Sequence, residues 1–203
     1  MMDNNRLINL EEARAILQFV KRVRPALNGV EVEYGEMFAY YPNDLIITIP
    51  EEFNENLGLT VLQHVNKEFN ADFEYNLKEI SIQALLHECG HHLDFEGKIM
   101  TRRISDYMKA DHYNRVKYEE AIQDFNERAK SFLYELEEYE ASEETDEELE
   151  FVLEQKRIDL DMEDDALDIL YRLIPTEYAA DEFSARFFMT YLKPYRKCNY
   201  NVL

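Results

Sequence analysis

Positive charge is scarce in this sequence. Lys and Arg together number 22 against 43 Asp and Glu, which leaves a formal net charge of −21 over 203 residues. Proteins that bind nucleic acid or anionic membranes generally use clustered Lys and Arg side chains. The composition therefore disfavours nucleic acid, membrane surfaces and acidic substrates as partners.

Cysteine, glycine and long apolar runs are also rare. The two cysteines, Cys89 and Cys198, allow at most one disulfide, which fits a reducing compartment. Five glycines argue against long flexible linkers. No stretch approaches the ~18 apolar residues of a membrane span, and the N-terminus lacks a basic region followed by an apolar run. We therefore expect a cytoplasmic protein.

Apolar residues are nevertheless plentiful, at 46% of the chain, and their spacing predicts the fold. Helical periodicity predicts helices from Asn9 to about Pro25, over 57–69, 77–95, 101–140 and 148–173, and after Pro175 with Thr176 as N-cap. Alternating β-branched and aromatic residues between 30 and 50 predict two or three strands, including a hairpin. The sequence thus predicts a mostly helical α+β fold, with a small N-terminal antiparallel sheet packed on a central helix, 77–95.

The acidity is concentrated in one segment. Residues 134–168 contain 17 Asp or Glu and two cations, Lys156 and Arg157, so this segment carries −15 and the other residues together only −6. It lies within a predicted helical region, 98–172, which we interpret as an acidic helical-hairpin insertion in a single domain, 1–203. A solvated helical face is the ordinary role of such a segment, and a docking surface for a protein partner is the alternative.

One motif in the predicted central helix is typical of metal chemistry. His87, Glu88 and His91 match H-E-x-x-H. At about 100° per residue, both imidazoles lie on adjacent turns of one face and can bind one Zn²⁺, with Glu88 beside them as the catalytic base. His92 lies about 140° from His87, so we expect it at the surface or behind the ligands. Alternatively, the histidines are held by hydrogen bonds in a polar pocket without a metal.

A zinc site with two histidines needs a third protein ligand. The best candidate is Glu177 in the last predicted helix, where Asp181 follows one turn later on the same face. We expect Glu177 to bind zinc and Asp181 to accept the free ring N–H of His87 or His91. Ala180 is small enough to let the two helices pack closely. Alternatively, the two carboxylates only interact favourably with the helix dipole.

The two motifs resemble those of the gluzincin metallopeptidases. More specifically, HECGHHLDF followed by EYAADEFSARFFM is similar to the ImmA/IrrE family of bacterial and phage-related peptidases, whose motifs read roughly HELGH and E-x-E-A-[DN]-x-F-A. Ala179 replaces the second Glu of the family motif, and 85 residues separate His91 from Glu177, more than we expect in this family. The resemblance covers only these motifs and, loosely, the preceding strands.

The motifs and the resemblance together imply a zinc-dependent endopeptidase that hydrolyses a protein or peptide substrate. An extended substrate could add to an edge strand of the 30–50 region, as many peptidase substrates do. The alternative is a catalytically silent binding or regulatory protein with a peptidase fold, which acts through its acidic insertion.

Overall fold

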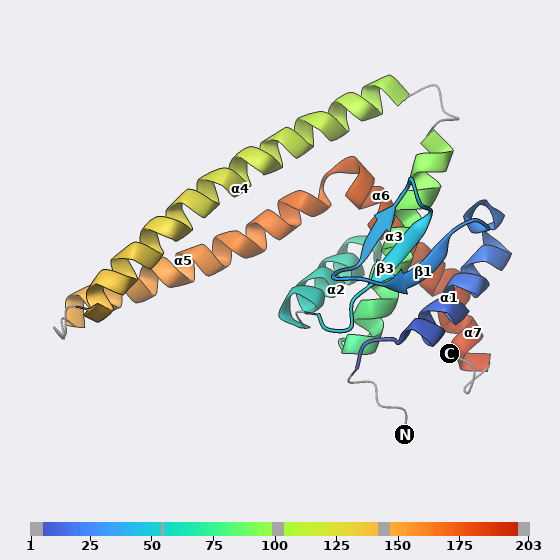
Figure 1. Cartoon of the computed structure of the whole chain (residues 1–203), viewed down its shortest axis with the longest axis horizontal. Helices are drawn as coiled ribbons and strands as arrows, with labels where there is room; N and C mark the ends of the chain where they lie inside the picture. Colours follow the sequence, from blue (N-terminus) through green and yellow to red (C-terminus); the bar gives the residue numbers. More distant parts are fainter. Residues whose placement is uncertain (1–5, 54, 99–103, 142–146, 199–203) are drawn as a thin grey trace. The chain divides into compact units, whose positions relative to one another are not determined.

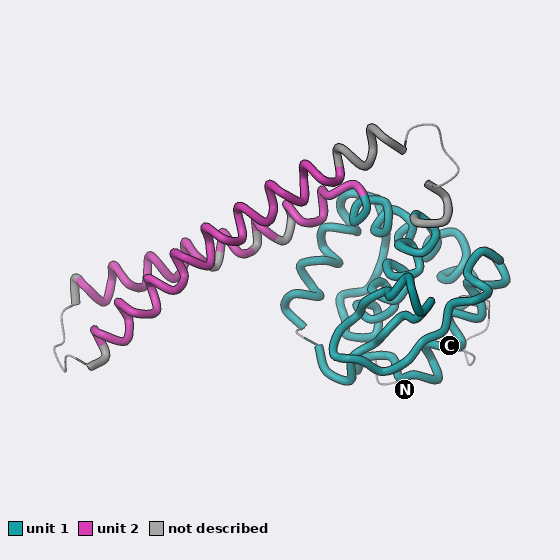
Figure 2. The backbone as a smooth tube through the Cα atoms, turned by 45° about the horizontal axis from the view of Figure 1, so that its top comes forward, with its two compact units in different colours: residues 1–106, 176–203 teal, residues 107–175 magenta. Residues whose placement is uncertain are grey.

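A computed structural model describes residues 6–53, 55–98, 104–141 and 147–198. The chain divides into two compact units, one formed by residues 1–106 and 176–203 and the other by residues 107–175 (Figure 2). The predicted insertion, 98–172, includes most of the second unit. That both units belong to one domain stays a prediction.

The first unit begins with helix α1 (Leu10–Val23), as predicted. Its N-terminus is a capping box, in which the Asn9 side chain accepts a hydrogen bond from the Glu12 N–H and the Glu12 carboxylate accepts one from the Asn9 N–H. The buried side chains of the helix recur at helical spacing: Ala13, Ile16, Leu17 and Val20. α1 packs against strand β1 (Glu31–Tyr34), and a short 3₁₀ turn, η1 (Pro25–Leu27), follows the helix in the chain.

Three short strands form a sheet in the order β1-β3-β2: β1 (Glu31–Tyr34), β2 (Ala39–Tyr41) and β3 (Ile46–Ile49). β2 and β3 form the predicted antiparallel hairpin. β1 pairs with β3 in parallel, so the expected antiparallel sheet was wrong for this pair. Alternation along the sequence predicts that a segment is a strand, but it does not predict the direction in which two non-consecutive strands pair. Polarity accounts for the strand order. β3, with sequence IITI, is the most apolar strand and lies in the centre, whereas the more polar EVEY of β1 suits an edge.

The central helix is α3 (Leu77–Lys98), which contacts β2, β3, η1 and helix α2 (Glu55–Phe69) (Figure 1). Its apolar side chains belong to the main core, which confirms the predicted central position: Ile80, Ile82, Leu85, Leu86 and Cys89. The predicted end at residue 95 was wrong, because the helix continues to Lys98. Gly97 is tolerated within a helix at a cost of about 1 kcal/mol and does not by itself end it.

The C-terminal part of the first unit is a nearly continuous helical segment. It comprises α6 (Pro175–Phe187), a π-helical turn (Phe188–Leu192) and α7 (Lys193–Cys198). Thr176 is not the N-cap that the sequence predicted, since α6 begins one residue earlier. Proline suits the first helical position because the N–H that it lacks would have no partner within the helix. Phe188 stacks on Phe73 at 3.9 Å between ring centroids and joins this segment to the core.

The second unit is built from two long helices, α4 (Ile104–Ala141) and α5 (Glu147–Arg172). Ion pairs join Arg128 to Glu163 and Glu135 to Lys156. Glu135 lies seven residues after Arg128 in α4, whereas its partner Lys156 lies seven residues before Glu163 in α5. The two helices are therefore antiparallel, as the predicted hairpin requires. The connection between the predicted helices 101–140 and 148–173 lies mainly outside the described residues. None of the described helices is both long enough and apolar enough to cross a membrane.

Glu12 links the start of α1 to α3. Its carboxylate lies 2.7 Å from Arg6 Nη1 and 3.1 Å from Nζ of the buried Lys78. Burial alone would raise the pKa of Glu12, but the hydrogen bonds from Arg6, the Asn9 backbone and Lys78 lower it to about 2. Because the folded pKa lies below the ordinary 4.5, the carboxylate stabilises the fold fully above pH 4.5 and loses this contribution as the pH falls toward 2.

We predict that Glu12→Gln lowers the free energy of unfolding at pH 7 by about 1–3 kcal/mol, because it leaves the buried Lys78 ammonium without its carboxylate. Urea unfolding at pH 7, 5 and 3 measures this, and the difference from wild type should shrink below pH 4.5. Glu11→Gln, in the same exposed first turn, is the control and should change stability little. A Glu12→Gln effect of equal size at pH 3 and pH 7 would contradict the assignment.

Candidate metal site

Two histidines and a glutamate of α3 form the candidate site. The ligand atoms of His87, Glu88 and His91 all lie within 4.8 Å of one another, and this group could hold a metal ion. The two imidazole rings are nearly perpendicular, at 89°, with centroids 4.6 Å apart. The spacing of four residues therefore brings both rings to one face of the helix, as the sequence predicted.

Helix α6 brings Glu177 to the same place. Its Oε2 atom lies 3.3 Å from Nε2 of His87 and 3.3 Å from Nε2 of His91. Glu177 is almost completely buried, so little water screens its charge. The structure thus brings Glu177, which is far from the two histidines in the sequence, into contact with both of them, as the sequence predicted.

Asp181, one turn after Glu177, contacts the other side of the His87 ring. The Nδ1–H of His87 donates a hydrogen bond to Asp181 Oδ1 at 2.7 Å, which confirms the predicted contact for this histidine. A carboxylate only accepts hydrogen bonds, so the proton of the neutral ring lies on Nδ1. The lone pair of Nε2 then points toward Glu177, where it is available to a metal ion.

Two further polar residues, Gln83 and Ser184, hold Asp181 in place. Sequence reasoning missed Gln83. Gln83 Nε2 donates to Asp181 Oδ1 at 3.2 Å and to Ser184 Oγ at 3.4 Å. The Ser184 hydroxyl in turn donates to the backbone carbonyl of Asp181 at 2.8 Å. Gln83 lies one turn before His87 on the same helix face, and a buried polar residue at this spacing was the signal that could have identified it.

The electrostatics of the site favour positive charge between the carboxylates. Burial alone would lower the pKa of His87, but the charge and hydrogen bond of Asp181 act against it and, with Glu177 and Glu88, raise it to about 9. Burial alone would raise the pKa of Glu177, but the two histidines hold it well below its usual range. Protons on the imidazoles or a bound metal ion can supply the positive charge that these carboxylates stabilise.

His92 has a structural role. It is buried, which excludes the surface position that the sequence allowed. Its Nε2–H donates to the Ala26 carbonyl at 2.9 Å, and Nδ1 accepts a hydrogen bond from the Tyr40 hydroxyl at 2.6 Å. Tyr40 lies in β2 and Ala26 in η1, so His92 fixes the histidine helix to the sheet and to the turn after α1.

Gly90 sets the distance between α3 and α6. A Cβ atom on Gly90 would lie 2.7 Å from the Cα and 3.0 Å from the carbonyl oxygen of Ala180. Both atoms belong to the backbone, so no side chain can rotate away to make room. The close packing expected from Ala180 therefore also requires glycine at position 90, and this contact holds Glu177 beside the histidines.

Comparison with known proteins gives no family assignment, since no family model, curated protein or solved structure matches the chain. The similarity to the gluzincin motifs therefore stays a prediction. Inference about function depends on the residues and the geometry of the site.

We predict that Gly90→Ala destabilises the fold by about 1–3 kcal/mol, because the added methyl group must push α3 and α6 apart. Thermal and urea unfolding measure the loss. The matched control is Gly29→Ala, where the nearest atom is the flexible end of the Leu45 side chain at 3.1 Å. The control should lose much less stability, and equal losses in the two variants would contradict the assigned role of Gly90.

Proposed function

We propose that this chain is a zinc-dependent endopeptidase, with His87, His91 and Glu177 as the metal ligands. The observation that supports the proposal most strongly is the position of the Glu177 carboxylate, with Oε2 3.3 Å from both Nε2 atoms. Two imidazoles and a carboxylate are a ligand set of catalytic zinc sites, in which the fourth position is left for water or substrate.

The spacing of the ligand atoms fits zinc. Zn–N bonds of about 2.0–2.1 Å and Zn–O bonds of about 2.0–2.2 Å, at the tetrahedral angle, place neighbouring ligand atoms about 3.4 Å apart. The two separations of 3.3 Å from Glu177 match this value. Asp181 supports the same interpretation, because it fixes the tautomer in which Nε2 of His87 can bind a metal.

The residues of the site have distinct roles in the proposed reaction. A zinc ion, when bound, supplies Lewis acidity that polarises the scissile carbonyl and lowers the pKa of a water molecule toward about 7. Glu88 takes a proton from the attacking water and delivers it to the leaving amine. Its carboxylate lies within 4.8 Å of the histidine nitrogens, close enough to reach a water molecule between them. Gln83 and Asp181 keep His87 oriented throughout.

Strand β2 is the part of the sheet that we propose for substrate binding. Its hydrogen-bonded neighbour within the sheet is β3, so its other edge can pair with an extended peptide. β2 packs against α3, and the hydrogen bond from Tyr40 to His92 ties it to the residue next to His91. A peptide added to this edge would run alongside the histidine helix.

We predict that the purified chain binds one equivalent of zinc at neutral pH, and that Asp181→Asn weakens zinc binding about 10–100-fold, because the imidazole loses its negatively charged partner. Competition with a chromophoric chelator measures both affinities. Asp72→Asn, which removes an exposed carboxylate of the same unit, is the control and should leave zinc affinity unchanged. Failure of the wild-type chain to bind stoichiometric zinc would refute the metal assignment.

We predict that Glu88→Gln retains zinc but cleaves peptides about 10²–10⁴-fold more slowly, since only the proton transfer is removed. Glu177→Gln should instead lose zinc. New N-termini generated in a proteome-derived peptide library, read by mass spectrometry, measure cleavage by each zinc-loaded variant.

Cleavage by Glu88→Gln at the wild-type rate would exclude Glu88 as the base. Loss of zinc in this variant would instead make Glu88 the third ligand. A zinc-loaded wild type that cleaves nothing would favour the catalytically silent alternative.

A further inference from the structure

The outer face of α5 carries large apolar side chains that are exposed. Phe151 is 65% exposed, Ile158 40% and Met162 68%. At about 100° per residue, these three positions lie within about 40° of one another around the helix axis. They therefore lie in one stripe along the helix, two turns apart at Phe151 and Ile158 and one turn apart at Ile158 and Met162.

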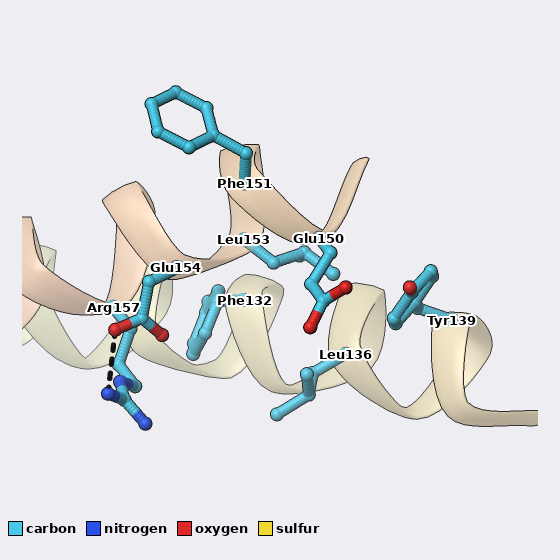
Figure 3. Close-up of a pocket in the computed structure, with 8 residues that line it drawn as sticks. All are labelled: Phe132, Leu136, Tyr139, Glu150, Phe151, Leu153, Glu154 and Arg157. Atoms are coloured by element: carbon cyan, nitrogen blue, oxygen red, sulfur yellow. Dashed lines mark hydrogen bonds and ion pairs between the residues drawn. The ribbon is translucent and has the colours of Figure 1, made fainter. Parts of the chain in front are cut away.

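The opposite face of α5 already packs against α4. Leu153 and Leu167 lie on that face and are buried. A groove of about 600 Å³ between the two helices is lined by apolar residues of both, Phe132 and Leu136 of α4 and Phe151 and Leu153 of α5. Figure 3 shows Phe132 and Leu153 between the helices, whereas Phe151 points away from α4. The stripe thus borders the groove at Phe151, whereas Ile158 and Met162 are not among the residues that line it.

The stripe has the spacing of a coiled-coil seam. Phe151, Gln155, Ile158 and Met162 follow one another at intervals of four, three and four residues, which corresponds to positions d, a, d and a of a heptad. We call these four residues the outer seam. In a coiled coil, such residues insert between side chains of a facing helix, and a single polar residue among them, here Gln155, favours one register.

The charges beside the outer seam define the partner. In the same heptad register, Glu154 and Asp159 occupy the flanking g and e positions, whose charges determine which helices pair. A second copy of this chain would bring like charges together across the interface, because residues 134–168 carry −15. A helix with Lys or Arg at its flanking positions would be complementary. The ion pair of Glu154 with Arg157 is exposed and therefore exchanges readily.

We propose that the outer seam of α5 binds an amphipathic, cationic helix of a partner protein, which adds to α4 and α5 as a third helix. The apolar a and d residues of the partner cover Phe151, Ile158 and Met162, and its Lys or Arg side chains pair with Glu154 and Asp159. This assignment is independent of the zinc site, because it concerns the other compact unit and a different chemistry.

The test uses the full-length chain and a synthetic three-heptad peptide with Leu at a and d and Lys at e and g. The peptide should bind with 1:1 stoichiometry by isothermal titration calorimetry and weaken as salt is added. Phe151→Gln combined with Met162→Gln should reduce its affinity at least tenfold, since truncated anchor residues typically cost more than 1 kcal/mol. Both side chains are exposed, so the variant should keep its fold, which circular dichroism checks.

Three controls make the result specific. The matched control variant is Tyr134→Gln, which removes an exposed aromatic residue of α4 outside the seam and should leave the affinity unchanged. A peptide with Glu in place of Lys, and a scrambled peptide of the same composition, should not bind. Equal binding of the scrambled peptide, or an equal loss of affinity in Tyr134→Gln, would reduce the interaction to non-specific charge attraction and overturn the proposal. Self-association of the wild type that the seam variant abolishes would overturn it in favour of a second copy.

Discussion

The close contact between Gly90 of α3 and Ala180 of α6 is the constraint on which the candidate site depends. The two helix backbones lie so close together that a single methyl group would not fit between them. Glu177 and Asp181 of α6 therefore lie against the two histidines of α3. The carboxylates and the histidines would not meet if the helices were further apart, because a carboxylate side chain reaches only a few ångströms. Glycine and alanine at the contact, rather than any polar interaction, make that approach sterically feasible.

The polar residues around His87 are buried and therefore must satisfy one another. Gln83, Ser184 and Asp181 form a hydrogen-bonded group behind His87, and His92 holds the same helix to the sheet from its other side. Because α3 also contributes much of the apolar core, the residues that hold the site in place are the residues that stabilise the unit. Changes behind His87 should therefore affect the geometry of the candidate site and the stability of the unit together.

The acidity of the chain is largely separate from this chemistry. The described part of the first unit combines an apolar core with a few paired charges, whereas the second unit carries a long acidic segment on two antiparallel helices. Cross-helix ion pairs, such as that of Arg128 with Glu163, use some of its few cations to hold the hairpin. Glu154 and Asp159 flank the exposed apolar residues of the outer seam, which is the surface that we propose for a partner helix.

The sequence by itself determined the features that depend on local spacing: the helices, the hairpin of β2 and β3, the shared face of His87 and His91, and the succession of Glu177 and Asp181. Only the tertiary structure decided what depends on contacts between distant segments. β1 pairs in parallel with β3, a strand that does not follow it directly in the chain. Gln83 meets Asp181, and His92 meets Tyr40, only once packing brings their helices and strands together. Periodicity specifies which face of a helix is apolar, but not which partner will cover it.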